Sequence, residues 1–206
     1  MTAPVLRPDL AIIADWIAPG SSVLDLGCGD GTLLQHLKTV KQVNGYGLEI
    51  DPPNLETCVA RNLNVIQADL NEGLAQYFAD NSFDYVVMSQ TLQATRRPDL
   101  LIGEMLRVGK QGIITFPNMA YWKGRMQLGL LGIMPKTRSL PNEWYDTPNI
   151  HLCTVKDFEQ LCQQHGIALM QRTFVDHSHR KSTLAMRLRP NLFGEIAIYH
   201  FCKKAA

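Results

Sequence analysis

The residues whose types and spacing suggest chemistry lie in a short glycine-rich stretch, Val23-Leu24-Asp25-Leu26-Gly27-Cys28-Gly29-Asp30-Gly31. Glycine at every second position allows a sharp turn and lets the backbone approach a ligand closely. Two carboxylates, Asp25 and Asp30, accompany the glycines. A glycine loop that follows a strand can hold many nucleotide-like ligands, so the loop alone identifies none of them.

Spacing and charge narrow the choice of ligand. The dinucleotide-binding fingerprint is Gly-x-Gly-x-x-Gly, whereas Thr32 stands here where its third glycine would fall. The two aspartates repel a pyrophosphate, but they can accept hydrogen bonds from an ammonium group. These features favour the methionine end of S-adenosylmethionine over NAD.

Two further carboxylates follow predicted strands. Glu49 ends a strand at 45–49, where it can accept hydrogen bonds from both ribose hydroxyls and would repel a 2′-phosphate. Asp69 comes just after a strand at 63–67, where it can accept a hydrogen bond from the adenine amino group. For Asp69 the alternative is a structural one, since an aspartate at this point often caps the next helix.

The elements that must position these residues alternate along the first half of the chain. A helix opened by Pro8 and closed by Pro19-Gly20 precedes them as a lid. Strands alternating with helices predict a parallel sheet. The predicted strands are 22–26, 45–49, 63–67, 83–88 and 112–116, and the predicted helices are 32–39, one after Pro52-Pro53, and 99–108.

The alternation breaks at residues 119–149, which we interpret as an inserted cap with little periodicity. Thr154 and Asp157 then resemble a capping box for a helix that ends at Gly166. Two strands follow, at 167–175 and 195–202. The segment between these strands shows no amphipathic helix, so we expect them to be antiparallel neighbours.

Composition predicts one globular domain over residues 1–206, with 46% hydrophobic and 19% charged residues. No apolar run is long enough to span a membrane, and the N-terminus lacks the features of a signal peptide. We therefore expect a soluble, cytoplasmic protein. Five scattered cysteines predict reduced thiols, and neither they nor His177, His179 and His200 show metal-ligand spacing, so no metal is predicted.

Charge is uneven along the chain: residues 1–118 carry a net charge of −5 and residues 119–206 carry +6. Lys123, Arg125, Lys136 and Arg138 lie in the cap beside Tyr121-Trp122, a mixture that can bind nucleic acid. Apolar residues interleave with these cations, however, which favours a semi-apolar docking surface or a core helix. We predict no nucleic-acid partner.

The glycine stretch at 23–31 resembles motif I of class I S-adenosylmethionine-dependent methyltransferases. The resemblance implies a three-layer αβα, Rossmann-like fold with a seven-stranded, mostly parallel sheet whose last strand is antiparallel. It also implies that the ends of the first four strands surround the cofactor. The predicted cofactor-binding residues are Asp25, Gly27, Cys28, Gly29, Asp30, Gly31, Glu49, Ile50, Asp69, Leu70, Ser89 and Gln90.

A closer resemblance covers residues 7–203 and points to the MetW family of methionine-biosynthesis proteins. The segments that carry it are 45–51, 89–94, 104–109, 114–118 and 144–151. The resemblance implies a role with a MetX-type homoserine O-acyltransferase, and it implies no particular methyl acceptor. Acyl transfer on that scaffold needs a Gly-x-Ser-x-Gly elbow, which this sequence lacks. We therefore expect an accessory subunit that senses S-adenosylmethionine, in a hetero-oligomer with the acyltransferase.

The alternative is a methyltransferase that acts on an unidentified small molecule. Its substrate-side candidates are Asn118, Tyr121, Tyr145 and His151, which flank the fifth strand and the cap. His151 has an equally plain structural role, a hydrogen bond to the backbone, and we assign no catalytic base. Ser89-Gln90-Thr91-Leu92 replaces the Asn/Asp-Pro-Pro-Tyr motif of nucleic-acid amino-methyltransferases, which disfavours base methylation.

Overall fold

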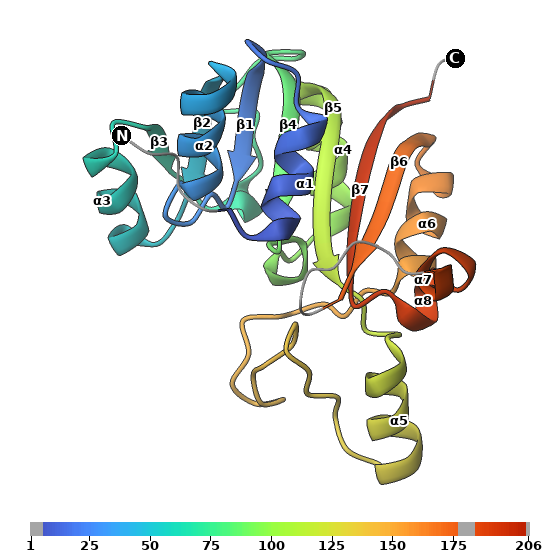
Figure 1. Cartoon of the computed structure of the whole chain (residues 1–206). Helices are drawn as coiled ribbons and strands as arrows, with labels where there is room; N and C mark the ends of the chain where they lie inside the picture. Colours follow the sequence, from blue (N-terminus) through green and yellow to red (C-terminus); the bar gives the residue numbers. More distant parts are fainter. Residues whose placement is uncertain (1–5, 177–183, 205–206) are drawn as a thin grey trace.

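A seven-stranded sheet with helices on both faces forms the body of the protein (Figure 1). The computed structural model describes residues 6–176 and 184–204. The strand order is β3-β2-β1-β4-β5-β7-β6. The strands are β1 Ser22–Leu26, β2 Asn44–Glu49, β3 Asn64–Gln67, β4 Phe83–Ser89, β5 Gly109–Pro117, β6 Ile167–Val175 and β7 Ile196–Lys203.

The first five strands pair in parallel, whereas β7 pairs antiparallel with both β5 and β6. This confirms the predicted fold and the predicted antiparallel pairing of the last two strands. The helices are α1 Pro8–Trp16, α2 Thr32–Lys41, α3 Pro52–Ala60, α4 Pro98–Val108, α5 Trp122–Leu131, α6 Val155–Gln164, α7 Leu184–Leu188 and α8 Pro190–Phe193, with 3-10 turns η1 Leu70–Glu72 and η2 Leu92–Ala94.

Two hydrophobic clusters, one on each face of the sheet, form the three layers. Alternate residues of β4 show the division, because Tyr85 and Val87 join the cluster that contains α1 and α2. Val86 and Met88 join the other cluster, to which α4 and α6 contribute. None of the described helices has both the length and the apolar character needed to cross a membrane.

Local sequence signals start several of these helices. Proline occupies the first turn of α1, α3 and α4, where its missing N–H has no intrahelical partner to lose. The predicted capping box of α6 is present: Asp157 donates its backbone N–H to the Thr154 hydroxyl, and its carboxylate accepts from the Thr154 backbone.

Lys41, at the end of α2, fixes α1 in its lid-like position. Its ammonium group donates hydrogen bonds to two carbonyl oxygens at the end of α1, that of Ala14, which also accepts the Ile17 N–H, and, at 2.6 Å, that of Ile17. Ile13 and Ile17 are fully buried beneath the helix. The start of α1 is thereby held beside the glycine loop.

The cap contains a helix that no periodicity in the sequence indicated. Ten of residues 119–149 form α5, which extends from the end of β5 away from the sheet (Figure 1). The alternative of a core helix is wrong, because Gly124 is the one buried residue of α5. Apolar side chains project on all sides of α5, so no amphipathic stripe marks it in the sequence.

Two short helices, α7 and α8, stand between β6 and β7, where the sequence showed no helix. Pro190 lies in the first turn of α8, so this proline begins a helix and does not break one. Both helices are too short for an amphipathic pattern to develop.

Candidate functional site

A cavity of about 480 Å³ opens at the edge of the sheet where β1 and β4 end. The chain leaves β1 toward β2 on one side and reaches β4 on the other, so this is the switch point at which open α/β sheets bind ligands. Most of the predicted cofactor residues meet here. The lining consists of Arg7, Leu10, Asp25, Gly27, Cys28, Gly29, Asp30, Thr32, Leu33, Ser89 and Gln90.

The three glycines of the loop all have left-handed backbone conformations, but their surroundings differ. A methyl group on Gly27 would lie 2.7 Å from the Thr91 hydroxyl oxygen, and one on Gly31 would collide with Leu63 and Cys58. Gly29 has no heavy atom within 4 Å of that position. Packing therefore requires glycine at 27 and 31, whereas Gly29 leaves open space on the cavity side of the loop.

Glu49 holds the glycine loop in place. Its Oε2 accepts a hydrogen bond from the Gly29 backbone N–H at 2.7 Å, and its Oε1 accepts from the N–H groups of Ile50 and Asp51. A carboxylate has about four acceptor sites, so these three bonds leave room for one more donor. The bond to Gly29 turns Glu49 toward the loop, as its expected cofactor role requires.

Asp25 supplies a buried carboxylate at the cavity. Its side chain is 3% exposed, and its Oδ1 has no hydrogen-bond partner among the described residues. Burial, with a smaller contribution from the negative charge of Glu49, raises the pKa of Asp25 to about 7. A cation that enters the cavity would relieve both the desolvation and the repulsion.

Asp30, the second aspartate of the loop, is already neutralised. Its carboxylate accepts hydrogen bonds from the backbone and hydroxyl of Thr32 and lies 3.2 Å from the Arg61 guanidinium. Although burial raises the pKa of Asp30, the bonds from Thr32 and Arg61 outweigh it and hold that pKa below its usual value. Of the two predicted ammonium acceptors, Asp25 is therefore the one left without a partner in the described structure.

Gln90 follows β4 and completes the opposite wall. Its backbone is left-handed, with φ of +58°, and its N–H donates to the hydroxyl and carbonyl oxygens of Thr115. The Gln90 side-chain amide nitrogen is buried and, within the part of the chain that the structure describes, has no acceptor. The neighbouring Ser89 hydroxyl lies 3.4 Å from that of Thr115. Two residues that line the cavity therefore carry hydrogen-bonding groups without a partner in the described structure: the side-chain amide nitrogen of Gln90, a donor, and Oδ1 of Asp25, an acceptor.

Five predicted cofactor residues lie outside this lining, namely Gly31 and Glu49, described above, and Ile50, Asp69 and Leu70. Asp69 accepts hydrogen bonds from the backbone and side chain of Asn71, so it caps η1, the structural alternative that the sequence left open. Leu70 packs against the core, and Ile50 is 57% exposed just after β2.

Arg7 is a residue of the cavity that sequence reasoning missed. Its guanidinium pairs with Asp9 at 3.1 Å, and its side chain remains 57% exposed. It is the one lysine or arginine among the described residues that line the cavity. A cation near Asp25 matches a zwitterionic ligand, since an α-amino acid carries an ammonium and a carboxylate side by side. In the sequence, the only signal for a role of Arg7 is its position just before Pro8, at the start of the lid helix.

Comparison with protein families shows to which family the chain belongs. The model of the family described as "Methionine biosynthesis protein MetW" matches residues 7–201. The chain belongs to the MetW family. A curated relative, the bifunctional methionine biosynthesis protein MetXA/MetW of Rhodopirellula baltica, is 36% identical over 95% of this chain. The chain spans about a third (33%) of the length of that relative.

Solved structures with the same fold include a putative methyltransferase and a cyclase. A chain from the complex between the Haloferax volcanii Trm112 methyltransferase activator and the putative methyltransferase superposes with a TM-score of 0.69, at 15% identity, over 96% of this chain and 90% of that one. The [4+2]-cyclase SpnF has a TM-score of 0.66, also at 15% identity, over 96% and 81%. This chain of the MetW family of methionine biosynthesis proteins therefore has a methyltransferase-like fold, and the fold alone does not define a reaction.

The four substrate-side candidates do not converge in this MetW-family chain. Asn118 is buried, and its side chain bonds four backbone groups, those of Ala120, Val155, Asn191 and Gly194.

The other three candidates are equally scattered. Tyr121 is buried at the start of α5, where burial raises its pKa, whereas Tyr145 is 72% exposed against Trp144. The His151 ring nitrogen Nε2 lies 3.0 Å from the carbonyl oxygen of Arg96, which is the structural role expected as its alternative. None of these described side chains lines the cofactor cavity, and we assign no catalytic base.

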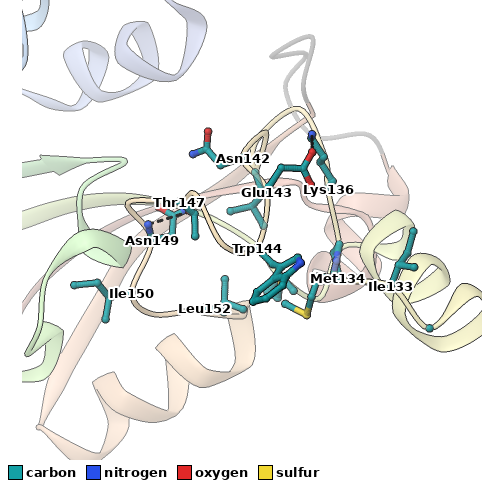
Figure 2. A pocket seen from close by; sticks show the side chains of 14 residues that line it. Ile133, Met134, Lys136, Asn142, Glu143, Trp144, Thr147, Asn149, Ile150 and Leu152 are labelled. Carbon is teal, nitrogen blue, oxygen red and sulfur yellow. Dashed lines mark hydrogen bonds and ion pairs between the residues drawn. The ribbon is translucent and has the colours of Figure 1, made fainter.

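A second cavity, of about 730 Å³, lies within the cap, where no sequence pattern indicated one (Figure 2). Apolar groups dominate its wall, and the ion pair between Lys136 and Glu143 lies on it. The lining residues are Met119, Gly132, Ile133, Met134, Pro135, Lys136, Leu140, Asn142, Glu143, Trp144, Thr147, Asn149, Ile150 and Leu152.

Thiols and possible metal ligands add no further site in residues 6–176 and 184–204. No group of three histidine, cysteine or acidic side chains there is arranged to hold a metal ion, and His177 and His179 lie outside the described residues. Cys28 and Cys58 are buried under the glycine loop, and burial raises the pKa of both thiols. Both side chains therefore serve packing in the described structure.

Proposed function

We propose that this MetW-family chain binds S-adenosylmethionine or S-adenosylhomocysteine at the switch-point cavity and acts as an accessory subunit of a MetX-type homoserine O-acyltransferase. The observation that carries the ligand is Asp25, a buried carboxylate whose Oδ1 lacks a partner in the described residues, at the foot of an open glycine loop. Such a group stays buried at a cost in free energy unless a cation joins it.

The donors and acceptors of the cavity fit this ligand. Asp25 would accept from its ammonium group, and Arg7 would face its carboxylate. Glu49 is buried outside the lining and bonds the Gly29 N–H, and its remaining acceptor site would take one ribose hydroxyl. Bound S-adenosylmethionine would supply a positively charged sulfonium with a transferable methyl group. The chain's own contribution is to bind and orient it, and the two carboxylates, Asp25 and Glu49, favour its charge.

The partner proposal draws on the Rhodopirellula baltica relative, whose name joins MetXA and MetW in one bifunctional chain. Fusion keeps two domains at high local concentration, as expected for domains that work together. The Gly-x-Ser-x-Gly elbow is absent from this sequence, so acyl transfer would take place on the partner. Since S-adenosylmethionine is made from methionine, its binding here would couple the end product of the pathway to an early step.

The second candidate is methyl transfer to a small molecule, which the methyltransferase fold favours. Methyl transfer needs positioning above all, and a general base only where the acceptor is poorly acidic. In-line attack needs substrate groups beside the cofactor, yet the four substrate-side side chains lie apart from one another and outside the cofactor cavity.

A glycine variant tests the cofactor site. We expect Gly29→Ala to weaken S-adenosylmethionine binding more than tenfold in calorimetry, because the new methyl group enters open space beside the ligand site. Gly166→Ala is the matched control: its φ of +65° also lies in the left-handed region, and nothing lies within 4 Å of the added carbon. Both variants carry about 1–2 kcal/mol of backbone strain, so their stabilities should match. Equal affinities in the two variants would refute the site.

An acyl-transfer assay separates subunit from enzyme. We expect a MetX-type acyltransferase from the same genome to copurify with this chain and to change its rate of homoserine acylation when the chain is added. Absence of both effects would remove the accessory role. Transfer of a labelled methyl group from S-adenosylmethionine to a small molecule in cell extract would instead support the methyltransferase.

A further inference from the structure

The cap exposes many apolar side chains that pack against no core in the described structure. Trp144 and Tyr145 are 73% and 72% exposed, and Leu130 is 75% exposed on a helix that buries one glycine. Leucine and methionine side chains on a helix normally face a core, and exposed apolar and aromatic clusters mark sites of protein association. The large apolar side chains exposed on the cap are Trp122, Met126, Leu128, Leu130, Leu131, Ile133, Met134, Trp144 and Tyr145.

The cap cavity gives this surface a shape that an anchor side chain can fill. Figure 2 shows the indole of Trp144 beside Met134 and Leu152, so that the apolar groups gather at one side of the hollow. The ion pair of Lys136 with Glu143 lies at another side. An apolar centre with polar groups at its margin is the arrangement of protein–protein interfaces.

The charge of the cap favours a partner of opposite sign. Lys123, Arg125 and Arg138 are exposed on the cap, and Lys136 is balanced by Glu143. Asp146 is the one other acidic residue of the cap, so residues 119–149 carry a net charge of +2. A second copy of this chain would bring the same cations together across an isologous contact. A partner with carboxylates around an apolar patch is complementary in charge.

Hydrogen bonds connect this surface with the cofactor cavity. The Gln93 carbonyl oxygen accepts from the backbone N–H groups of Ile150 and His151, at 2.8 and 3.0 Å. The buried Gln93 side chain donates to the Gln90 carbonyl oxygen at 2.7 Å. Ile150 lines the cap cavity and Gln90 lines the cofactor cavity. A contact at the cap can therefore bias the wall of the cofactor cavity, and the reverse holds by thermodynamic linkage.

We propose that the apolar face of the cap is the docking surface for the acyltransferase. The inference rests on the proposed partnership, for which the fused MetXA/MetW relative names the class of occupant. The acyltransferase would insert an apolar side chain into the cap cavity and place acidic groups near the exposed cations. The sheet and its flanking helices remain outside the contact.

Two cap variants test this surface in the 206-residue chain. We expect Leu131→Asp and Trp144→Ala each to weaken binding of the acyltransferase at least about 30-fold in calorimetry. Leu100→Asp is the matched control, because Leu100 is also a helical leucine, 56% exposed on α4 against 68% for Leu131. Circular dichroism and S-adenosylmethionine titration should give the same result for all variants.

The outcomes separate the docking surface from the partnership. Loss of binding in the two cap variants, with the control unaffected, supports the cap. If the unaltered chain and both cap variants bind the acyltransferase equally, the docking surface is elsewhere and the partnership stands. If the unaltered chain does not bind at all, the partnership and its surface both fail. Sedimentation showing dimers of this chain that Leu131→Asp abolishes would assign the face to self-association, against the proposal.

Discussion

Replacing Asp25 with asparagine should weaken S-adenosylmethionine binding by roughly 10- to 150-fold and should also stabilise the ligand-free protein at neutral pH. The affinity falls because a charge-assisted hydrogen bond to the ammonium group, of about 1.5–3 kcal/mol, becomes a neutral one. The ligand-free protein becomes more stable because the buried carboxylate, with its unpartnered Oδ1, is replaced by a neutral group of similar size. Calorimetry and denaturant unfolding on the same samples measure the two effects.

The pH dependence of stability follows from the same carboxylate. Its pKa rises from 3.8 to about 7 on folding, so below pH 3.8 it is protonated in both states and carries no penalty. As pH increases toward 7 the unfolded state ionises first, and stability is lost, on the order of 4 kcal/mol in all. The difference in unfolding free energy between Asp25→Asn and the parent should therefore grow from pH 5 to pH 7 and then level off.

Ligand binding should show the opposite dependence. Because the ligand's ammonium group favours the ionised carboxylate, affinity should rise up to tenfold per pH unit below about pH 7. It should fall again above about pH 8, where an α-amino group loses its proton. The asparagine variant should lack the rise. Subtracting the pH profile of the Asp25→Asn variant from that of the parent also removes the contributions of other titrating groups. One of these is His200, whose pKa is lowered by burial. A variant with unchanged affinity and the parent's pH profile would show that Asp25 does not contact the ligand.

The body of the fold was predictable because its signals are local. A short apolar strand runs straight into the glycine loop, prolines open three helices, and Thr154 begins α6 with a capping box that needs no distant partner. The antiparallel pairing of β6 and β7 was predicted because the sequence between them lacks the pattern of a crossover helix. That prediction survived the presence of α7 and α8 because neither is long enough to carry the chain across the sheet.

The cap was not predictable because burial does not shape it. Helix prediction depends on an apolar stripe that faces a core, and α5 faces no core in the described structure. Its leucines and methionines are therefore uninformative about the position of the helix. They become informative once their exposure is known, because the same residues then point to a partner.

At the cofactor site, residue types were predictable but their partners were not. The pairing of Asp30 with Arg61 joins residues 31 positions apart, and it decides which aspartate stays available for a ligand. Arg7 reaches the cavity because Lys41 holds the far end of α1. Such contacts depend on how helices pack on the sheet, which the spacing of motifs does not encode.

Gly27→Ala should lower the free energy of unfolding by about 3 kcal/mol. The left-handed backbone, with φ of +71°, accounts for about 1–2 kcal/mol. The remainder comes from overpacking, because the new carbon would lie 2.7 and 2.8 Å from Thr91 Oγ1 and Cγ2. Gly20→Ala, at φ of +73° with nothing within 4 Å, measures the backbone strain alone in the same denaturant titration.

A double-mutant cycle with Thr91→Ala identifies the contact. Thr91→Ala removes the two closest atoms and leaves only the Cβ of residue 91, at 3.2 Å, so in that background Gly27→Ala should have little more effect than Gly20→Ala, and the coupling energy should be about 1–2 kcal/mol. The Thr91 hydroxyl also donates to the Ser89 carbonyl, so Thr91→Ala itself should destabilise by about 1 kcal/mol. Additive effects in the cycle would mean that the two loops are not in close contact. Coupled effects would show that β1 and β4 set the width of the cavity by touching at Gly27, because a side chain there would push the walls apart.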